Sequence, residues 1–323
     1  IDTTNAEGAG AGSIRMPYES TPYTGEEIKP SVIVTYNGVD LVENTDYTLE
    51  YTNNISVGTA TVTIKGIRET TPDVGNFKGT VTKTFEITKA PLTIRAVVSK
   101  EEITYGDACP TLSYEIDADQ LLGDDKAHYA DPELYGMTES EVLTSIFSTI
   151  PSPAVTTTYK VSDLLRRSVG TYPVTVGAFA SDNYEISIEN TEFNVVKKEL
   201  IVRANHDDLR VTFGQTEYPN GSGVLIKQGY YGVSVTGFVF DETLDDLTCR
   251  GGMYVSTNYR PYPETNYQEA GDICTAYIDN VTGGTCPDNE DVNYKLVYYN
   301  NQDEVTTGQL AYITVSEGTL TVT

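Results

Sequence analysis

Histidine is the first residue type to test for catalysis in this sequence, and only two are present. His128 lies in "KAHYA" and His206 in "ANHDD", both in polar contexts typical of turns. A hydrolytic triad needs a histidine base between a nucleophile and a carboxylate. The chain also has no G-x-S-x-G elbow and no P-loop motif. We interpret both histidines as surface residues and expect a protein that is not an enzyme, with no catalytic residue and no cofactor.

Carboxylates are abundant, with 47 Asp and Glu residues, so pairing two of them by eye for glycoside hydrolysis is uninformative. Two acidic clusters, "DETLDDL" (241–247) and "PDNEDVNY" (287–294), could offer oxygen ligands to Ca²⁺. Neither follows the EF-hand spacing, and acidic runs of this kind are commonly solvated loops. We predict no metal site.

Tyrosine is the more informative side chain, because the chain has 24 tyrosines and no tryptophan. The stretch "NYRPYPETNY" (258–267) places Tyr259, Tyr262 and Tyr267 beside Arg260 in one expected loop. Amphipathic tyrosines suit interfaces, and loops on a rigid scaffold expose them. These four residues are the candidate ligand-binding site; the alternative is that the tyrosines pack on neighbouring strands.

The cysteines are Cys109, Cys249, Cys274 and Cys286, and their spacing lacks the paired pattern of a zinc site. One disulfide is possible among Cys249, Cys274 and Cys286, and full reduction is equally compatible with the sequence. Cys109, in "DACP", has no local partner.

The formal net charge is −26, from 21 Lys and Arg against 47 Asp and Glu. Such a surface is a poor match for nucleic acid or for anionic membranes. No apolar run approaches the ~20 residues of a membrane span, so no transmembrane segment is expected. Residues 1–13 read as a flexible lead-in without an apolar signal core.

The chain repeats itself at a distance of 108 residues. "ITKAPLTIRA" (87–96) aligns without a gap on "VVKKELIVRA" (195–204), and the alignment continues until Tyr105 falls on Phe213. Segment ends repeat as well: runs opened by Gly58, Gly170 and Gly271 are each followed by an Asn–aromatic pair and a closing strand. The Asn–aromatic pairs are Asn76-Phe77, Asn183-Tyr184 and Asn293-Tyr294. Self-similarity on this scale indicates tandem domains of one design.

We therefore predict three domains, 14–88, 89–196 and 197–323, after the lead-in. The second carries an insertion near 125–168, and the third has long loops rich in Tyr and Cys. Because almost no linker separates them, we expect a rod of domains joined end to end, and a monomer.

Period-two alternation dominates each segment, as in "SVIVTYNG", where a strand meets an Asn-Gly turn suited to a tight hairpin. The fold class we predict is all-β, as tandem small antiparallel Ig-like sandwiches, with β-grasp domains as the structural alternative. One short helix is predicted near 139–149, where Thr138 and Glu141 have capping-box spacing and Pro151 follows.

Taken in order, these motifs resemble a known family. "KAPLTIRA", "ITYGD", "GDD", "VGTYPVTV" and "DNYEIS" in the second segment, and "KKELIVRA", "VTFGQ", "TGFVFDETLDDL", "VNYKLVYYN" and "GTLTVT" in the third, resemble MBG-type β repeats of bacterial surface proteins. The first segment, with "YTGEEIKPSVIV" and "GNFKGTVTKTFEI", is similar to a bacterial Ig-like surface repeat. The resemblance covers nearly all of the chain after residue 14.

This resemblance implies an exported, extracellular bacterial cell-surface protein that acts as an adhesin-like stalk or binding module for a glycan or protein ligand. Since fold does not fix function, the implication is an expectation. The alternative is an accessory carbohydrate-binding region of a polysaccharide-processing system, which would bind glycan through the Tyr-rich third segment.

Overall fold

The computed structural model describes most of the chain, with its gaps concentrated towards the C-terminus. The described residues are 12–71, 73–204, 208–216, 233–243, 246–247, 254–257, 260, 263–266, 269–270, 273–279, 292–299, 304–305, 309–317 and 320. Within them the chain is mostly β-strand, which confirms the all-β expectation at that level. None of the described helices has the length and apolar character needed to cross a membrane.

Two compact units make up the chain. Unit 1 comprises Ile1–Ser99, Thr111–Thr157 and Pro173–Thr191, and unit 2 comprises Lys100–Pro110, Thr158–Tyr172 and Glu192–Thr323. Each unit thus contains residues from two of the three predicted domains. The three-domain division stays a prediction.

The N-terminal part of unit 1 is built from two small sheets. One has the order β1 (Gly12–Arg15), β3 (Ile33–Tyr36), β4 (Val39–Asp40), and the other β2 (Ser20–Pro22), β7 (Thr80–Thr88), β6 (Gly58–Gly66), β5 (Tyr47–Thr52). Alternate residues of β6 are buried, including Val62 and Ile64, which have no exposed surface. They form a core cluster with Val32, Val34 and Tyr47.

The predicted Asn-Gly turn is confirmed between β3 and β4. Asn37 and Gly38 both have positive φ, 52° and 78°, as a tight two-residue hairpin requires.

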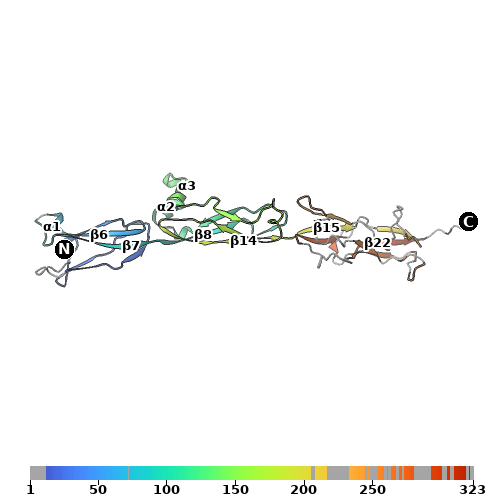
Figure 1. The fold of residues 1–323 in the computed structure, drawn as a ribbon, viewed down its shortest axis with the longest axis horizontal. Helices are drawn as coiled ribbons and strands as arrows, with labels where there is room; N and C mark the ends of the chain where they lie inside the picture. The colour runs from blue at the N-terminus through green and yellow to red at the C-terminus, as the bar shows by residue number, and fades with distance from the viewer. Residues whose placement is uncertain are drawn as a thin grey trace. The chain divides into compact units, whose positions relative to one another are not determined.

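The rest of unit 1 joins strands to the helical insertion. One sheet here has the order β10 (Leu112–Ile116), β8 (Ala90–Val98), β13 (Tyr184–Glu189). The helical segments are η1 (Ala118–Gln120), α2 (Gly123–Ala130), η2 (Glu133–Tyr135) and α3 (Glu139–Ile146). After them, β11 (Val155–Thr157) pairs with β12 (Gly170–Val176). Figure 1 shows α2 and α3 beside one another. Val142 and Ile146 of α3 enter the core that contains Leu92 and Ile94 of β8.

Unit 2 contains two four-stranded sheets and a shorter strand pair. One sheet has the order β17 (Val233–Thr236), β15 (Lys198–Ala204), β20 (Tyr294–Tyr299), β21 (Glu304–Val305), and the other β16 (Asp208–Thr212), β22 (Gln309–Ser316), β19 (Ile273–Asp279), β18 (Tyr254–Thr257). In addition, β9 (Glu102–Thr104) pairs with β14 (Thr191–Val196).

Five of the six sheets in the described part of the chain contain a parallel pair, and this corrects the expectation of antiparallel sandwiches. The pairs β2·β7, β8·β13, β9·β14, β15·β20 and β16·β22 are all parallel. Parallel neighbours need a long crossover, and here most of each repeat separates the two partners. Period-two alternation reports which face of a strand is buried and carries no information on its direction.

The predicted helix near 139–149 is confirmed as α3, and two further helices were not predicted. α3 runs from Glu139 to Ile146 behind a complete capping box formed by Thr138 and Glu141. α2 and the four-residue α1 (Ile67–Thr70) were not predicted, and neither has a side-chain hydrogen bond at its N-cap.

Candidate functional site

The predicted tyrosine loop falls largely outside the described residues. Tyr259, Tyr262 and Tyr267 are not among them, so their role as a binding site stays a prediction. Arg260 is described: its side chain is exposed and its guanidinium lies 3.9 Å from the Glu264 carboxylate.

The other residues singled out by chemistry are placed in part. Cys109 is exposed and not in a disulfide, and the half-buried ring of His128 contacts Tyr135 with 4.5 Å between ring centroids. The side chains outside the described set are His206, Cys249, Cys274 and Cys286, so the possible disulfide stays open. Among the described residues, no group of His, Cys, Asp and Glu could hold a metal ion.

A different cluster of polar side chains emerges in unit 1, which we call the first junction. The hydroxyls of Tyr184 and Tyr23 both donate to Oδ2 of Asp125, at 2.9 and 3.4 Å. The two rings meet edge to face, with 5.5 Å between centroids and an interplanar angle of 84°. The Tyr184 hydroxyl also accepts the backbone N–H of Leu122 at 3.1 Å. One carboxylate thereby joins Tyr23, from the first predicted domain, to Tyr184 of the second.

Asn183, the neighbour of Tyr184, completes the first junction. Its Oδ1 accepts the backbone N–H of Val57 at 3.2 Å, and its carbonyl accepts the N–H of Ala90 at 3.1 Å. The side chain of one residue therefore bonds the first predicted domain while its backbone bonds the second.

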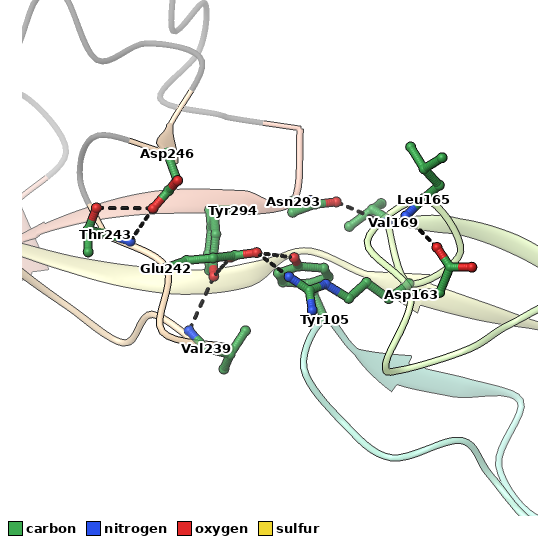
Figure 2. A network of polar contacts seen from close by, with 11 residues as sticks. Tyr105, Asp163, Leu165, Val169, Val239, Glu242, Thr243, Asp246, Asn293 and Tyr294 are labelled. Atoms are coloured by element: carbon green, nitrogen blue, oxygen red, sulfur yellow. Dashed lines mark hydrogen bonds and ion pairs between the residues drawn. The ribbon is translucent and has the colours of Figure 1, made fainter.

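Unit 2 contains a second junction of the same design (Figure 2). The Tyr294 hydroxyl donates to Oε2 of Glu242 at 2.5 Å, and the Tyr105 hydroxyl donates to Oε1 at 2.7 Å. The two rings are again edge to face, at 5.3 Å and 85°. The Tyr294 hydroxyl accepts the N–H of Val239 at 3.2 Å, as Tyr184 accepts that of Leu122.

The asparagine is repeated with the tyrosine. Oδ1 of Asn293 accepts the N–H of Val169 at 3.0 Å, and its carbonyl accepts the N–H of Lys198 at 3.1 Å. Val169 precedes Gly170 just as Val57 precedes Gly58, so both asparagines bind equivalent points of the repeat. Two junctions separated by more than 100 residues thus use the same donors and acceptors.

Arg167 distinguishes the second junction from the first. Its Nη2 lies 2.8 Å from Oε1 of Glu242, and the two side chains are only 12% and 13% exposed. The guanidinium carbon lies 3.8 Å from the centre of the Phe240 ring, a cation–π geometry. Among the described residues, no partner is found for the buried Nε of Arg167. The second junction is therefore a buried ion pair as well as a tyrosine network.

Burial also changes the acidities at both junctions. It raises the pKa of Tyr23 to about 12, with Asp125 adding to the effect, and that of Tyr105 to about 12, with the hydrogen bond to Glu242 adding. The pKa values of Tyr184 and Tyr294 are raised too, again mainly by burial. All four hydroxyls stay protonated near neutral pH and act as donors, so the arrangement holds chain segments together and offers no proton acceptor of tyrosinate type.

The first junction should respond to pH through Asp125. Burial raises its pKa above 3.8, against hydrogen bonds from Tyr184 and Tyr23 that lower it. The folded protein then holds this proton more tightly than the unfolded chain, so the contribution of Asp125 to stability falls as pH rises above 3.8. We expect the free energy of unfolding of Asp125→Asn, measured relative to wild type by denaturant titration, to improve as pH rises above 3.8 and to level off once Asp125 is ionised in the folded protein.

An exposed carboxylate elsewhere in the insertion provides the control for that titration. Glu133→Gln removes one carboxylate charge that does not act on Asp125, and it should leave the pH profile unchanged. Parallel profiles for wild type and Asp125→Asn would contradict the assignment.

The sequence identified the asparagine and tyrosine residues of the junctions in part, and it did not identify their carboxylates. Sequence analysis singled out the Asn-Tyr pairs and Tyr105, and it quoted "GDD" and "TGFVFDETLDDL" as repeat motifs without assigning a role to Asp125 or Glu242. The segment 241–247 was interpreted as a solvated acidic loop, whereas Glu242 is buried in the ion pair with Arg167. The missed signal was an acidic residue three positions after Leu122 and after Val239.

A scan against protein-family models finds no matching family, and a search of curated proteins finds no matching sequence.

Proposed function

We propose that this chain is a non-enzymatic, exported bacterial cell-surface protein whose tandem β segments form a stalk or adhesin-like binding module. The observation that carries the proposal is the duplicated junction. Two unrelated enzyme lobes would have no reason to share the same tyrosine pair, carboxylate and asparagine contacts. A chain built by repeating one connectable unit would repeat them.

The short connections support the same function. A single residue, Lys89, separates β7 from β8, and its Nζ donates to the carbonyl of Ser181 at 2.6 Å. A single residue, Lys197, likewise separates β14 from β15. Connections this short leave little slack, and together with the junction contacts they favour a stiff spacer that presents a ligand site away from the cell.

Small-angle X-ray scattering of the purified whole chain tests the stalk. We expect one extended particle whose maximum dimension stays constant from low to high salt. A compact particle, or a broad distribution of lengths that changes with salt, would contradict a stiff spacer.

Binding to an array of glycans, mucins and matrix proteins tests the ligand. The Tyr259/Tyr262/Tyr267→Ala variant is measured beside the wild type, and we expect a specific hit that the variant loses. Saturable binding of a soluble polysaccharide would favour the accessory carbohydrate-binding region instead. Catalytic turnover abolished by a single carboxylate or histidine substitution would overturn the non-enzymatic assignment.

A further inference from the structure

A pocket that none of the repeat motifs explains lies between the insertion and β10 in unit 1. Its volume is about 460 Å³, within the range of small-molecule sites. Ile116, Val142 and Leu143 contribute the apolar part of its lining, Tyr114 and Tyr129 the aromatic part, and Glu139 the charge. These side chains come from β10, α2 and α3, which lie together in the same unit.

The wall formed by α3 is held in a fixed position. The Thr138 hydroxyl accepts the N–H of Glu141, and the Glu141 carboxylate accepts the N–H and hydroxyl of Thr138, which fixes the first turn where Glu139 stands. Val142, one turn further, is 1% exposed. The pocket is therefore largely preformed.

The aromatic wall is also anchored. The ring of Tyr114 packs against Phe179 with 5.0 Å between centroids. Burial raises the pKa of Tyr129, and the charges of Glu115 and Glu139 raise it further, against a hydrogen bond with the backbone of Ile116 that lowers it. No Lys, Arg or His is among the lining residues. The pocket lining thus combines two tyrosine side chains with a carboxylate.

We propose that this pocket binds an organic cation of the alkylammonium class, such as a quaternary ammonium group. Aromatic faces attract such cations through the ring quadrupole, and a carboxylate at the rim adds a Coulombic attraction. The aliphatic floor accommodates the methyl or methylene groups that surround the nitrogen. This site is additional to the proposed stalk or adhesin function and does not depend on it.

The lining favours alkylammonium over guanidinium. A guanidinium presents five N–H donors and is best held by two-point contacts to carboxylates. Here the lining side chains offer one carboxylate and two tyrosine hydroxyls, and the other lining side chains are aliphatic. An alkylammonium group has fewer N–H donors than a guanidinium, so fewer donors remain without a hydrogen-bond acceptor in this pocket.

Isothermal titration calorimetry of the full chain tests the proposal with three probes: choline, arginine and dimethylbutanol, the neutral isostere of choline in which carbon replaces nitrogen. We expect choline to bind about five-fold or more tightly than dimethylbutanol, since only choline gains the cation–π and carboxylate terms. Arginine should bind more weakly than choline. Equal binding of choline and dimethylbutanol, or tighter binding of arginine, would overturn the assignment.

Two pairs of variants locate the site. Glu139→Gln should weaken choline binding about five-fold, whereas Glu133→Gln, an exposed carboxylate of the same insertion outside the lining, should not. Tyr129→Leu should weaken it about five-fold or more, whereas Tyr135→Leu, a 49% exposed tyrosine outside the lining, should not.

Tyr129→Phe keeps the aromatic face and guards against a trivial loss of folding. It should retain choline binding within about two-fold, because the ring and not the hydroxyl holds the cation. Choline binding that survives both Glu139→Gln and Tyr129→Leu, or no choline binding by a folded wild-type chain, would reject this pocket as the site.

Discussion

Glu242→Ala should lower the free energy of unfolding of unit 2 by about 3–5 kcal/mol. The substitution leaves Arg167, only 12% exposed, as a buried charge without its carboxylate, and it removes the acceptor of the Tyr105 and Tyr294 hydroxyls. Breaking one side of a buried ion pair costs more than the pair contributes, because the remaining charge stays desolvated. Denaturant titration measures the free energy of unfolding. Hydrogen exchange of the β15 and β20 amides shows that the loss of stability lies in unit 2, which contains the ion pair.

A double variant separates the buried charge from simple loss of contacts. Arg167→Met combined with Glu242→Leu removes both charges and keeps apolar volume, so it should recover a large part of the lost stability. Asp241→Asn, at the exposed position next to Glu242, is the matched control: it removes a charge, and Asn tolerates the positive φ of 60° at this position, so stability should change by less than about 0.5 kcal/mol. A double variant as unstable as Glu242→Ala would show that the charge pair is not the cause.

The strands were predictable because burial and alternation agree along them. In β6, Ala60, Val62 and Ile64 are buried while the residues between them are partly exposed, which is the pattern read from "GTATVTI". The positions of the strands follow from such local patterns. Their parallel pairing does not, because β8 and β13 become neighbours only through the long crossover between them.

The two long helices of the insertion show the same limit. α3 was predicted because Thr138 and Glu141 have the spacing of a capping box, a signal contained in four consecutive residues. α2 begins after Leu122 without a side-chain cap and has no buried residue. Neither capping nor a buried stripe marks it in the sequence, so only its tertiary setting, beside η1 and α3, distinguishes it from a polar loop.

The junction carboxylates were unpredictable for a related reason. Asp125 lies 59 residues from Tyr184 and 102 from Tyr23, and Glu242 lies 137 from Tyr105. In a chain with 47 acidic residues, a single sequence cannot show which two are desolvated. The repeat does indicate their position. The N–H groups of Leu122 and Val239 each donate to a junction tyrosine, and Asp125 and Glu242 lie three residues after them.

Gly25→Ala is expected to open the first junction and to cost about 3 kcal/mol in the free energy of unfolding. Gly25 has φ +77°, and a Cβ there would lie 2.5 Å from the backbone nitrogen of Gly123 and 2.6 Å from its Cα. The left-handed conformation accounts for about 1 kcal/mol of that cost. The close approach adds about 2 kcal/mol, because the atoms it meets are backbone and cannot rotate aside.

Gly38→Ala separates these two contributions. Gly38 has nearly the same φ, +78°, but no described atom lies within 4 Å of its added Cβ, so only the backbone term of about 1 kcal/mol applies. Hydrogen exchange gives the local readout: in Gly25→Ala the N–H groups of Leu122 and Val57, which bond Tyr184 and Asn183, should exchange faster, and in Gly38→Ala they should not. Equal costs for the two substitutions would mean that the backbones of Gly25 and Gly123 are not held in contact, and the first junction would then lose its role in fixing the repeats.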